Sequence, residues 1–240
     1  MLSSSLELYL AEVERVWSEI LSLALRAEPR VVADVGAGDS TQRLLQSSVE
    51  LVIALDADCC KLARISRASS AKLELLCADA RLIPLRSRSV DLAVLHFVLH
   101  EIDPRLHREA LAEVGRAAKR VLITEPTPRG SELYAELWRV WRSAARFMGS
   151  FEEYRDPSYW LRLLDELGFR VLESRVIRWR APVPHEVLED LARAWSREWV
   201  EKGVPREVLS RLWRVVGRAR FGELRWSSIF AVLALSPEAS

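Results

Sequence analysis

The order of apolar and polar positions predicts strands that alternate with helices along the whole chain. Short apolar runs are typical of strands buried on both faces of a parallel sheet. Between them, apolar residues recur every three or four positions, as they do in amphipathic helices. The runs expected to be strands are 31–35, 51–55, 73–77, 92–95, 120–124, 169–179 and 226–235. This alternation predicts an α/β fold built on a doubly wound sheet.

Helices are expected wherever the three-to-four spacing holds. The segments are 6–24, 41–47, 59–69, 104–118, 159–168 and two helices within 184–222. Serines at 3–5 can cap the first helix, which we interpret as a packing element rather than a substrate lid. The apolar stripes within 184–222 are typical of a buried core or a dimer seam. Alternatively, the tryptophans of 131–154 and 184–222 cover an apolar or aromatic ligand.

The segment Val31–Thr41, VVADVGAGDST, has the layout of a nucleotide-type pocket. An apolar strand is followed by Gly36 and Gly38, and polar residues then open a helix. Glycines lack the Cβ atom that would keep a ligand away from the backbone. A helix that begins at Ser40 or Thr41 would point its free N–H groups into the same space. By itself the motif also fits an ordinary tight turn between a strand and a helix.

Three acidic residues, Asp34, Asp56 and Asp79, come at the ends of three successive predicted strands. In an open parallel sheet the carboxyl ends of the strands meet at one edge, so these side chains are expected to line one crevice. Asp56 lies 20 positions after Gly36, the distance at which a strand–helix–strand unit brings an acid to ribose hydroxyls. The sequence therefore predicts a cofactor that carries a nucleoside. Asp58 is interpreted only as a helix cap.

Composition narrows the expected partners and compartment. The formal net charge is +1, which gives no global field for nucleic acid or membrane. No apolar run approaches the roughly 20 residues that span a bilayer, and the start of the chain lacks the order of a signal peptide. We therefore expect a cytoplasmic protein without a membrane span. The absence of asparagine and the presence of only two glutamines point to a thermophile, although a genome of biased composition would give the same pattern.

The three cysteines, Cys59, Cys60 and Cys77, are an odd number and lack metal-ligand spacing. They cannot form the disulfide framework of a small secreted protein. We expect them to be reduced and to bind no metal.

Five stretches carry a resemblance to a known family. They are DVGAGDS at 34–40, ALDAD at 54–58, CADARLIPL at 77–85, SVDLAVLHFVLHEID at 89–103 and VLITEP at 121–126. Together they resemble class I S-adenosylmethionine-dependent methyltransferases, most closely the small-molecule branch typified by ubiquinone and menaquinone biosynthesis methyltransferases (methyltransferase type 11-like). The resemblance covers 31–126 well and the later strands only by their order. Ser40 stands where the third glycine is usual, and AAKR at 117–120 replaces a glycine pair common before the fifth strand.

The resemblance implies a mostly parallel, seven-stranded sheet of the Rossmann-like methyltransferase fold with inserted helices. A single methyltransferase domain would cover residues 1–240, with an N-terminal helix at 1–28 and a cofactor-binding core at 29–126. Residues 127–156 and 184–225 would form a helical cap or insertions, through which a homodimer could form.

The resemblance also implies that the cofactor is S-adenosyl-L-methionine. The two glycines would let the backbone approach the methionine part while Asp34 steadies the loop and the ammonium side, Asp56 binds the ribose and Asp79 binds the adenine amino group. The expected cofactor-binding residues are Asp34, Gly36, Gly38, Asp56, Ala57, Asp79, Ala80 and His96. An NAD enzyme is the nearest competitor. Thr41, however, replaces the third glycine of that fingerprint, and a pyrophosphate would enter a crevice lined with acids.

Methyl transfer is an in-line displacement at a sulfonium, which needs positioning more than it needs a base. His96 and Glu125 are the candidate catalytic residues because each stands where a strand ends and could take a proton. Alternatively, His96 is not catalytic and forms part of the pocket wall. His100 is interpreted as structural, and no metal is expected.

The predicted function is methyl transfer to a small, hydrophobic or aromatic metabolite. The Asn/Asp-Pro-Pro-aromatic motif of enzymes that methylate nucleobase amino groups is absent after the fourth strand. One alternative is an RNA or protein methyltransferase, to which arginines gathered on one face would be suited. Those arginines are at 129, 139, 142, 146, 175, 178 and 180. The other is a non-catalytic subunit that keeps the fold and binds a partner through its inserted helices.

Overall fold

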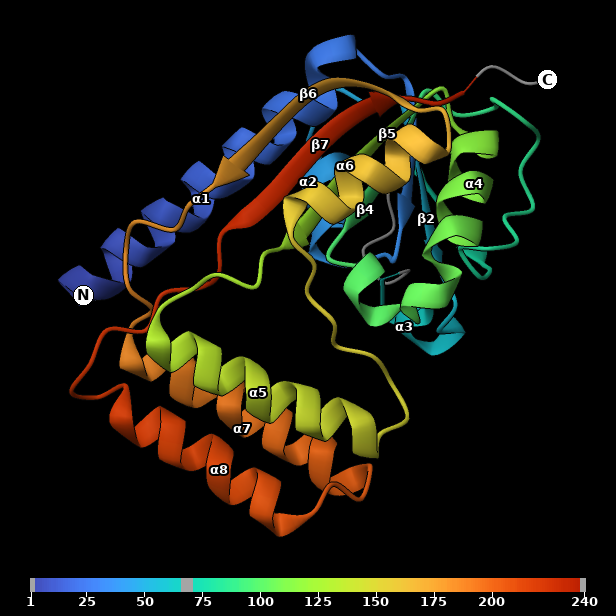
Figure 1. Cartoon of the computed structure of the whole chain (residues 1–240). Coiled ribbons are helices and arrows are strands. Elements are labelled where there is room, and N and C mark those ends of the chain that lie inside the picture. The colour runs from blue at the N-terminus through green and yellow to red at the C-terminus, as the bar shows by residue number, and fades with distance from the viewer. Residues whose placement is uncertain (1–2, 66–70, 238–240) are drawn as a thin grey trace.

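The computed structural model describes residues 3–65 and 71–237. Its strands are β1 Val31–Val35, β2 Leu51–Asp56, β3 Leu73–Cys77, β4 Leu92–His96, β5 Arg120–Pro126, β6 Arg170–Ile177 and β7 Ile229–Leu235. They form one sheet in the order β3-β2-β1-β4-β5-β7-β6 (Figure 1). β7 runs antiparallel to both of its neighbours, and the other neighbouring strands are parallel. The predicted α/β fold with a mostly parallel seven-stranded sheet is confirmed.

The helices lie where the spacing of apolar residues predicts them, except for the helix at 132–147, which falls within the residues 127–156 expected to form a helical cap or insertion. They are α1 Ser4–Ala24, α2 Asp39–Leu45, α3 Cys59–Ile65, α4 His107–Ala117, α5 Glu132–Phe147, α6 Pro157–Glu166, α7 His185–Glu201 and α8 Arg206–Arg218, with short 3-10 turns η1 Leu25–Ala27, η3 Leu99–Glu101 and η4 Pro104–Leu106. Ser3 caps α1 by accepting a hydrogen bond from the N–H of Leu6 at 3.2 Å. The helix predicted at 104–118 is a 3-10 turn followed by α4. Residues 66–69 of the helix predicted at 59–69 lie outside the described residues.

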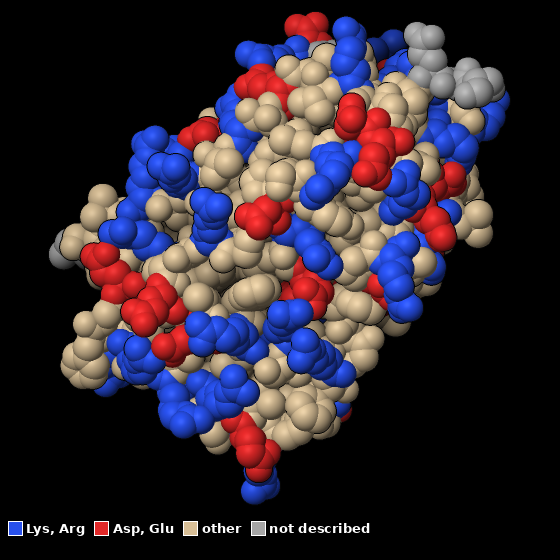
Figure 2. All heavy atoms as spheres, in the orientation of Figure 1, with Lys and Arg blue, Asp and Glu red and all other residues tan. Residues whose placement is uncertain are grey.

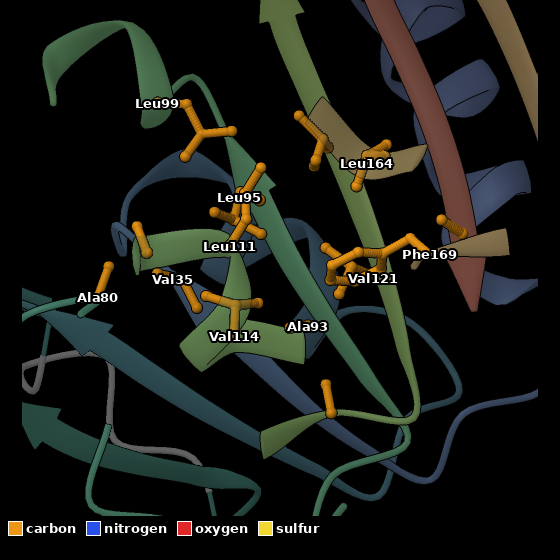
Figure 3. Packing of buried hydrophobic residues seen from close by; sticks show 14 of the residues in the cluster. Val35, Ala80, Ala93, Leu95, Leu99, Leu111, Val114, Val121, Leu164 and Phe169 are labelled. Atoms are coloured by element: carbon orange, nitrogen blue, oxygen red, sulfur yellow. The ribbon is translucent and has the colours of Figure 1, made fainter. Parts of the chain in front are cut away.

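Successive strand residues point to opposite faces of the sheet, and helices cover both faces. On one face, Leu95 of β4 packs with Leu111 of α4 and Leu164 of α6, in the cluster that Figure 3 shows. On the other face, Val94 packs with Ile20 of α1. The sheet is therefore doubly wound, and its carboxyl edge stays free to build a site.

Helices α5, α7 and α8 form a helical cap, which lies below the sheet in Figure 1. The cap has a core of its own, in which Leu188, Trp199 and Leu212 are fully buried. The N-terminal half of α1 adds Tyr9 to the same core. The apolar stripes of 184–222 are therefore core positions, and these buried residues do not form an exposed dimer seam.

Charges of both signs are interspersed over the face shown in Figure 2. The arginines that could have gathered on one face are divided between the cap and the sheet, with Arg142 on α5 and Arg175 on β6. Both are ion-paired, with Glu153 and Glu173 respectively. Within residues 3–65 and 71–237, no helix has the length and apolar character needed to cross a membrane.

Cys59 and Cys77 form a disulfide, so the expectation that all three cysteines are reduced is wrong. Cys77 ends β3 opposite Asp56 in the parallel register, which brings the start of α3 beside it. The two Cα atoms are 5.3 Å apart, within the range that a disulfide spans. Sequence spacing could not show this contact because it depends on the register of two strands. Cys60 is exposed and free.

We expect thiol titration of the unfolded, unreduced protein to detect Cys60 alone, and all three cysteines after reduction. Changing Cys59 and Cys77 together to serine should lower the free energy of unfolding by about 3 kcal/mol, because the bridge restricts the unfolded chain. Urea denaturation measures this loss. Cys60→Ser is the control and should change stability by less than about 0.5 kcal/mol. Equal thiol counts before and after reduction would exclude the bridge.

Candidate active site

A cavity of about 470 Å³ opens at the carboxyl ends of β1, β2, β3 and β4. It collects residues from the four turns that follow these strands. The predicted cofactor residues that line it are Gly36, Gly38, Asp56, Ala57, Asp79, Ala80 and His96. Of the predicted set, only Asp34 does not line this cavity.

Gly36 holds a position that only glycine fits. Its φ is +78°, in the left-handed region, and a Cβ atom there would lie 2.2 Å from Cγ2 of Val98. The N–H groups of Gly36 and Ala37 donate to the carbonyl oxygen of Leu55 at 2.7 and 3.0 Å, which fixes the turn to β2. Gly38 differs, because the nearest atom to its Cβ position is 3.9 Å away. Its bare backbone leaves room at the cavity wall for a ligand.

Asp34 is fully buried behind the glycine turn, so the structure differs from the expectation that it lines the crevice. Its carboxylate accepts hydrogen bonds from the hydroxyls of Ser40 and Thr41. The hydroxyl oxygen of Thr41 also accepts from the N–H of Gly38 at 3.2 Å. Burial raises the pKa of Asp34 to about 6, although the two hydroxyls act to lower it. Asp34 therefore holds the turn and the start of α2, with Ser40 as one of its partners.

Asp56 and Asp79 do face the cavity, and each already has a cationic partner. The carboxylate of Asp56 accepts from the N–H of Asp58 at 2.8 Å and lies 2.8 Å from Nζ of Lys61. Arg81 donates to both oxygens of Asp79 at 2.9 and 2.7 Å, and this pairing lowers the pKa of that carboxyl. A ligand at either acid would share the carboxylate with the cation or displace it.

His96 is poorly suited to take a proton. Its Nδ1 lies 2.7 Å from the hydroxyl of Thr124, and its ring contacts Trp17 and Phe97 at centroid distances of 4.5 and 4.3 Å. Burial, together with the positive charge of nearby His100, lowers the pKa of His96 to about 3. The imidazole is therefore neutral and a weak base at neutral pH. This geometry favours the pocket-wall alternative over the catalytic one.

Glu125 is buried and lines neither this cavity nor the one described next. Its carboxylate accepts hydrogen bonds from the backbone N–H groups of Val98, Leu99 and His100 at 2.9, 2.7 and 3.3 Å. It also lies 2.8 Å from Nδ1 of His100. With its oxygens engaged in this way, Glu125 anchors the loop after β4 and is not placed to act as a base.

His100 is held as a cation beside that carboxylate. Burial alone would lower the pKa of His100, but the charge and hydrogen bond of Glu125, with help from Glu152 and Glu101, raise it to about 9. Nε2 of His100 lies 4.0 Å from Glu152. The structural interpretation of His100 fits its buried pairing, although its side chain also reaches a second cavity.

The second cavity, of about 530 Å³, lies between the sheet edge and the helical cap. Its wall is strongly aromatic, with contributions from α5, α7 and the loops that flank them. These aromatic residues are Phe97, Tyr134, Trp138, Trp141, Tyr154, Trp179, Trp195 and Trp226. Trp138 stacks on Tyr154 with ring centroids 5.0 Å apart. Such a wall suits a flat or apolar molecule.

The two cavities meet at Asp39, Phe97 and Glu101, which line both. Phe97 has a φ of +57°, an uncommon value for a residue other than glycine. Its N–H donates to the carbonyl oxygen of Thr124 at 2.9 Å, which holds the strained residue in place. Phe97 therefore stands where a molecule in one cavity would contact a molecule in the other.

Sequence reasoning placed Trp138 and Trp141 over a ligand, and both line the second cavity. Of the two phenylalanines in and beside the same segment, Phe147 is 60% exposed, while Phe151 lines the first cavity. Sequence reasoning missed the junction residues and much of the polar and aromatic wall, which are Asp39, Phe97, Glu101, Tyr134, Glu152, Tyr154 and Trp226. Asp39, Phe97 and Glu101 lie within stretches that carried the resemblance, but nothing in those stretches assigned them to a site. The other four come from parts of the chain that no motif marks.

The glycine turn, the acids beyond β2 and β3 and the loop after β4 belong to a segment with known relatives. Residues 33–124 match the family described as "Methyltransferase domain". This segment is a methyltransferase domain. The methyltransferase domain is of the class I type that uses S-adenosylmethionine as its cofactor. No curated protein matches the chain.

Solved structures share the fold of the whole chain. The [4+2]-cyclase SpnF has a TM-score of 0.64 at 15% identity, over 94% of this chain and 81% of that one. The YcgJ protein of Bacillus subtilis has a TM-score of 0.60 at 16% identity, over 92% and 100%. Phosphoethanolamine N-methyltransferase 2 of Haemonchus contortus, solved with phosphomonomethylethanolamine and S-adenosylhomocysteine, has a TM-score of 0.57 at 17% identity, over 92% and 53%. At these identities the likeness shows the fold alone.

We expect calorimetric titration of the whole protein to show binding of S-adenosylmethionine and S-adenosylhomocysteine and no binding of NAD. Asp56→Ala should weaken the two adenosyl ligands by about 10- to 150-fold, because a carboxylate that accepts from ribose hydroxyls typically contributes about 1.5–3 kcal/mol. Glu50→Ala, which removes an exposed acid paired with Arg30 outside the cavity, is the matched control. Equal affinities of Asp56→Ala and the control would exclude Asp56 as the ribose ligand.

Proposed function

We propose that the protein transfers a methyl group from S-adenosylmethionine to a small, hydrophobic or aromatic molecule. The observation that supports this most directly is that two neighbouring cavities share Asp39, Phe97 and Glu101 in their walls. The first cavity contains the glycine turn and Asp56 of a methyltransferase domain. The second is large enough for a small molecule and mostly aromatic. Two neighbouring sites with a shared boundary suit a transfer between two bound molecules.

The fit of the cofactor to the first cavity rests on its wall. The open space at Gly38 would let the backbone approach the methionine part, and Asp56, which lines the same cavity, would accept hydrogen bonds from the ribose. When bound, S-adenosylmethionine supplies an electrophilic methyl group that needs no activation by the protein. The chain's own residues then hold the acceptor in line and exclude water from the junction. Neutral His96 would contribute as part of that wall.

A small-molecule acceptor is favoured over RNA by the second cavity, whose wall includes Trp138 and Trp141 of α5 and Trp195 of α7 and contains no lysine or arginine among the described residues. Among the solved neighbours, the Haemonchus contortus enzyme was crystallised with a small acceptor, phosphomonomethylethanolamine. The ubiquinone and menaquinone branch, the cytoplasmic location and the thermophilic source stay predictions from the sequence.

The test measures methyl transfer from labelled S-adenosylmethionine to a panel of small aromatic alcohols and amines. Trp138→Ala and Trp141→Ala should each raise the KM of an accepted aromatic by about 10- to 100-fold, because a large aromatic contact of about 1.5–3 kcal/mol is lost. Trp213→Ala is the control, since Trp213 lies on α8 outside both cavities and is 38% exposed. If both cavity variants accept every substrate with the KM of the control, the aromatic cavity is not the acceptor site.

A further inference from the structure

The wall of the second cavity carries acidic side chains as well as aromatic ones, and it has no unpaired positive charge among the described residues. Carboxyl side chains reach it from Asp39, Glu101 and Glu152, and among the described residues no lysine or arginine lines it. The one cation in the wall, His100, is paired with buried Glu125 at 2.8 Å. The cavity as a whole is therefore electronegative, and the faces of tryptophan and tyrosine rings attract cations as well.

The placement of two of these acids is the decisive feature. Asp39 and Glu101 line both cavities, so they stand at the junction where the transferred methyl would lie. Both residues are exposed. In the described part of the chain, neither carboxylate has a hydrogen-bond or ion-pair partner. Asp34, Asp56, Asp79 and Glu125 all have such partners, so the junction acids are the uncommitted ones of the site.

We propose that the acceptor atom is an amine nitrogen, carried by an aromatic or apolar body and held at the junction by Asp39 and Glu101. This rests on the proposed function, which it makes specific. The body of the molecule occupies the aromatic cavity, whose wall includes Trp138, Trp141 and Trp195. The nitrogen lies beside Phe97, between the two carboxylates and next to the cofactor cavity.

The chemistry balances with these groups alone. The amine binds as an ammonium ion and gives up one proton to a junction carboxylate or to the solvent that reaches these exposed residues. Its lone pair then forms the new N–C bond as the S–C bond breaks, and the sulfur keeps the bonding electrons. The positive charge passes to the methylated nitrogen, where the same carboxylates and ring faces stabilise it.

The test compares three probes of nearly the same shape: tryptamine (cationic), tryptophol (neutral) and indole-3-propionate (anionic). Their binding to the protein saturated with S-adenosylhomocysteine is measured by calorimetry. We expect tryptamine to bind about tenfold more tightly than tryptophol, and indole-3-propionate to bind more weakly than both. In the double variant Asp39→Asn, Glu101→Gln, the affinity for tryptamine should fall to that for tryptophol. Glu74→Gln, an exposed acid of β3 outside both cavities, is the control.

Each alternative result counts against a different statement. Equal or tighter binding of tryptophol would overturn the amine assignment and leave the aromatic cavity in place. A double variant that weakens S-adenosylhomocysteine as much as tryptamine would show that the acids serve the cofactor. If none of the probes binds while S-adenosylhomocysteine does, the aromatic cavity is not an acceptor site, and the proposed function fails together with this inference.

Discussion

Replacement of Glu125 by alanine is expected to lower the free energy of unfolding by about 3–5 kcal/mol. The carboxylate is 1% exposed and accepts hydrogen bonds from three backbone N–H groups at the start of η3. It also faces the imidazolium of His100 at 2.8 Å. Alanine would leave these donors buried without an acceptor and the cation without a counter-charge, which costs more than the lost contacts alone.

Urea denaturation at neutral pH measures this loss, with Glu125→Gln as the comparison. Glutamine keeps the shape and one acceptor oxygen, so its loss should be smaller than that of alanine, although the charge opposite His100 is gone. Circular dichroism establishes that each variant is folded before the titration. A loss below about 1 kcal/mol for Glu125→Ala would mean that this carboxylate does not anchor the loop.

Because Glu125 is paired with His100, the free energy of unfolding should also depend on pH. His100 has a pKa of about 9 in the folded chain against about 6.5 when unfolded, so the folded state binds its proton more tightly. The pair's contribution, about 3 kcal/mol, is fully present below about pH 6.5 and is lost as the pH rises through about 9. In Glu125→Ala, burial lowers the pKa of His100 instead, so this decline in stability between about pH 6.5 and 9 should disappear.

The sequence predicted most of the residues that meet in the first cavity, because that cavity is built from local turns. Each strand ends in a turn a few residues long, and the parallel order brings these turns to one edge, so Gly36, Asp56 and Asp79 could be placed from spacing alone. Asp34 was misplaced for a reason that spacing cannot show. Strand residues alternate between the two faces, and only the register and the hydroxyls of α2 decide that its carboxylate turns inward.

The wall of the second cavity could not be predicted in the same way because it is built from distant segments. It combines the loop after β4, helix α5, the loop before α6, helix α7 and the segment that enters β7. Helical spacing identifies apolar stripes, but a buried stripe looks the same whether it faces a core or a cavity. Trp199 is in the cap core while Trp195, four positions earlier, lines the cavity. Only the packing of the three cap helices separates the two roles.

The second large effect on stability is expected at the glycine turn, where the same change, glycine to alanine, can be made at Gly36 and at Gly38. Gly36→Ala should lower the free energy of unfolding by about 2–5 kcal/mol. Part of this is the cost of a left-handed φ for alanine, about 1–2 kcal/mol, and the rest is overpacking against Val98, about 1–3 kcal/mol. Thermal or urea unfolding measures it without any ligand, so the effect is separate from cofactor binding.

Gly38→Ala is the matched variant, because a Cβ atom there would meet nothing closer than 3.9 Å in the protein. We expect its stability to stay within about 1 kcal/mol of the parent, since no protein atom has to move. Its affinity for S-adenosylhomocysteine should nevertheless fall by about tenfold or more, because the new methyl group would occupy space at the cavity wall that the ligand needs. Gly36 would then be required by the fold and Gly38 by the cofactor. Two variants with the same stability and the same affinity would show that the two glycines do not have these separate roles.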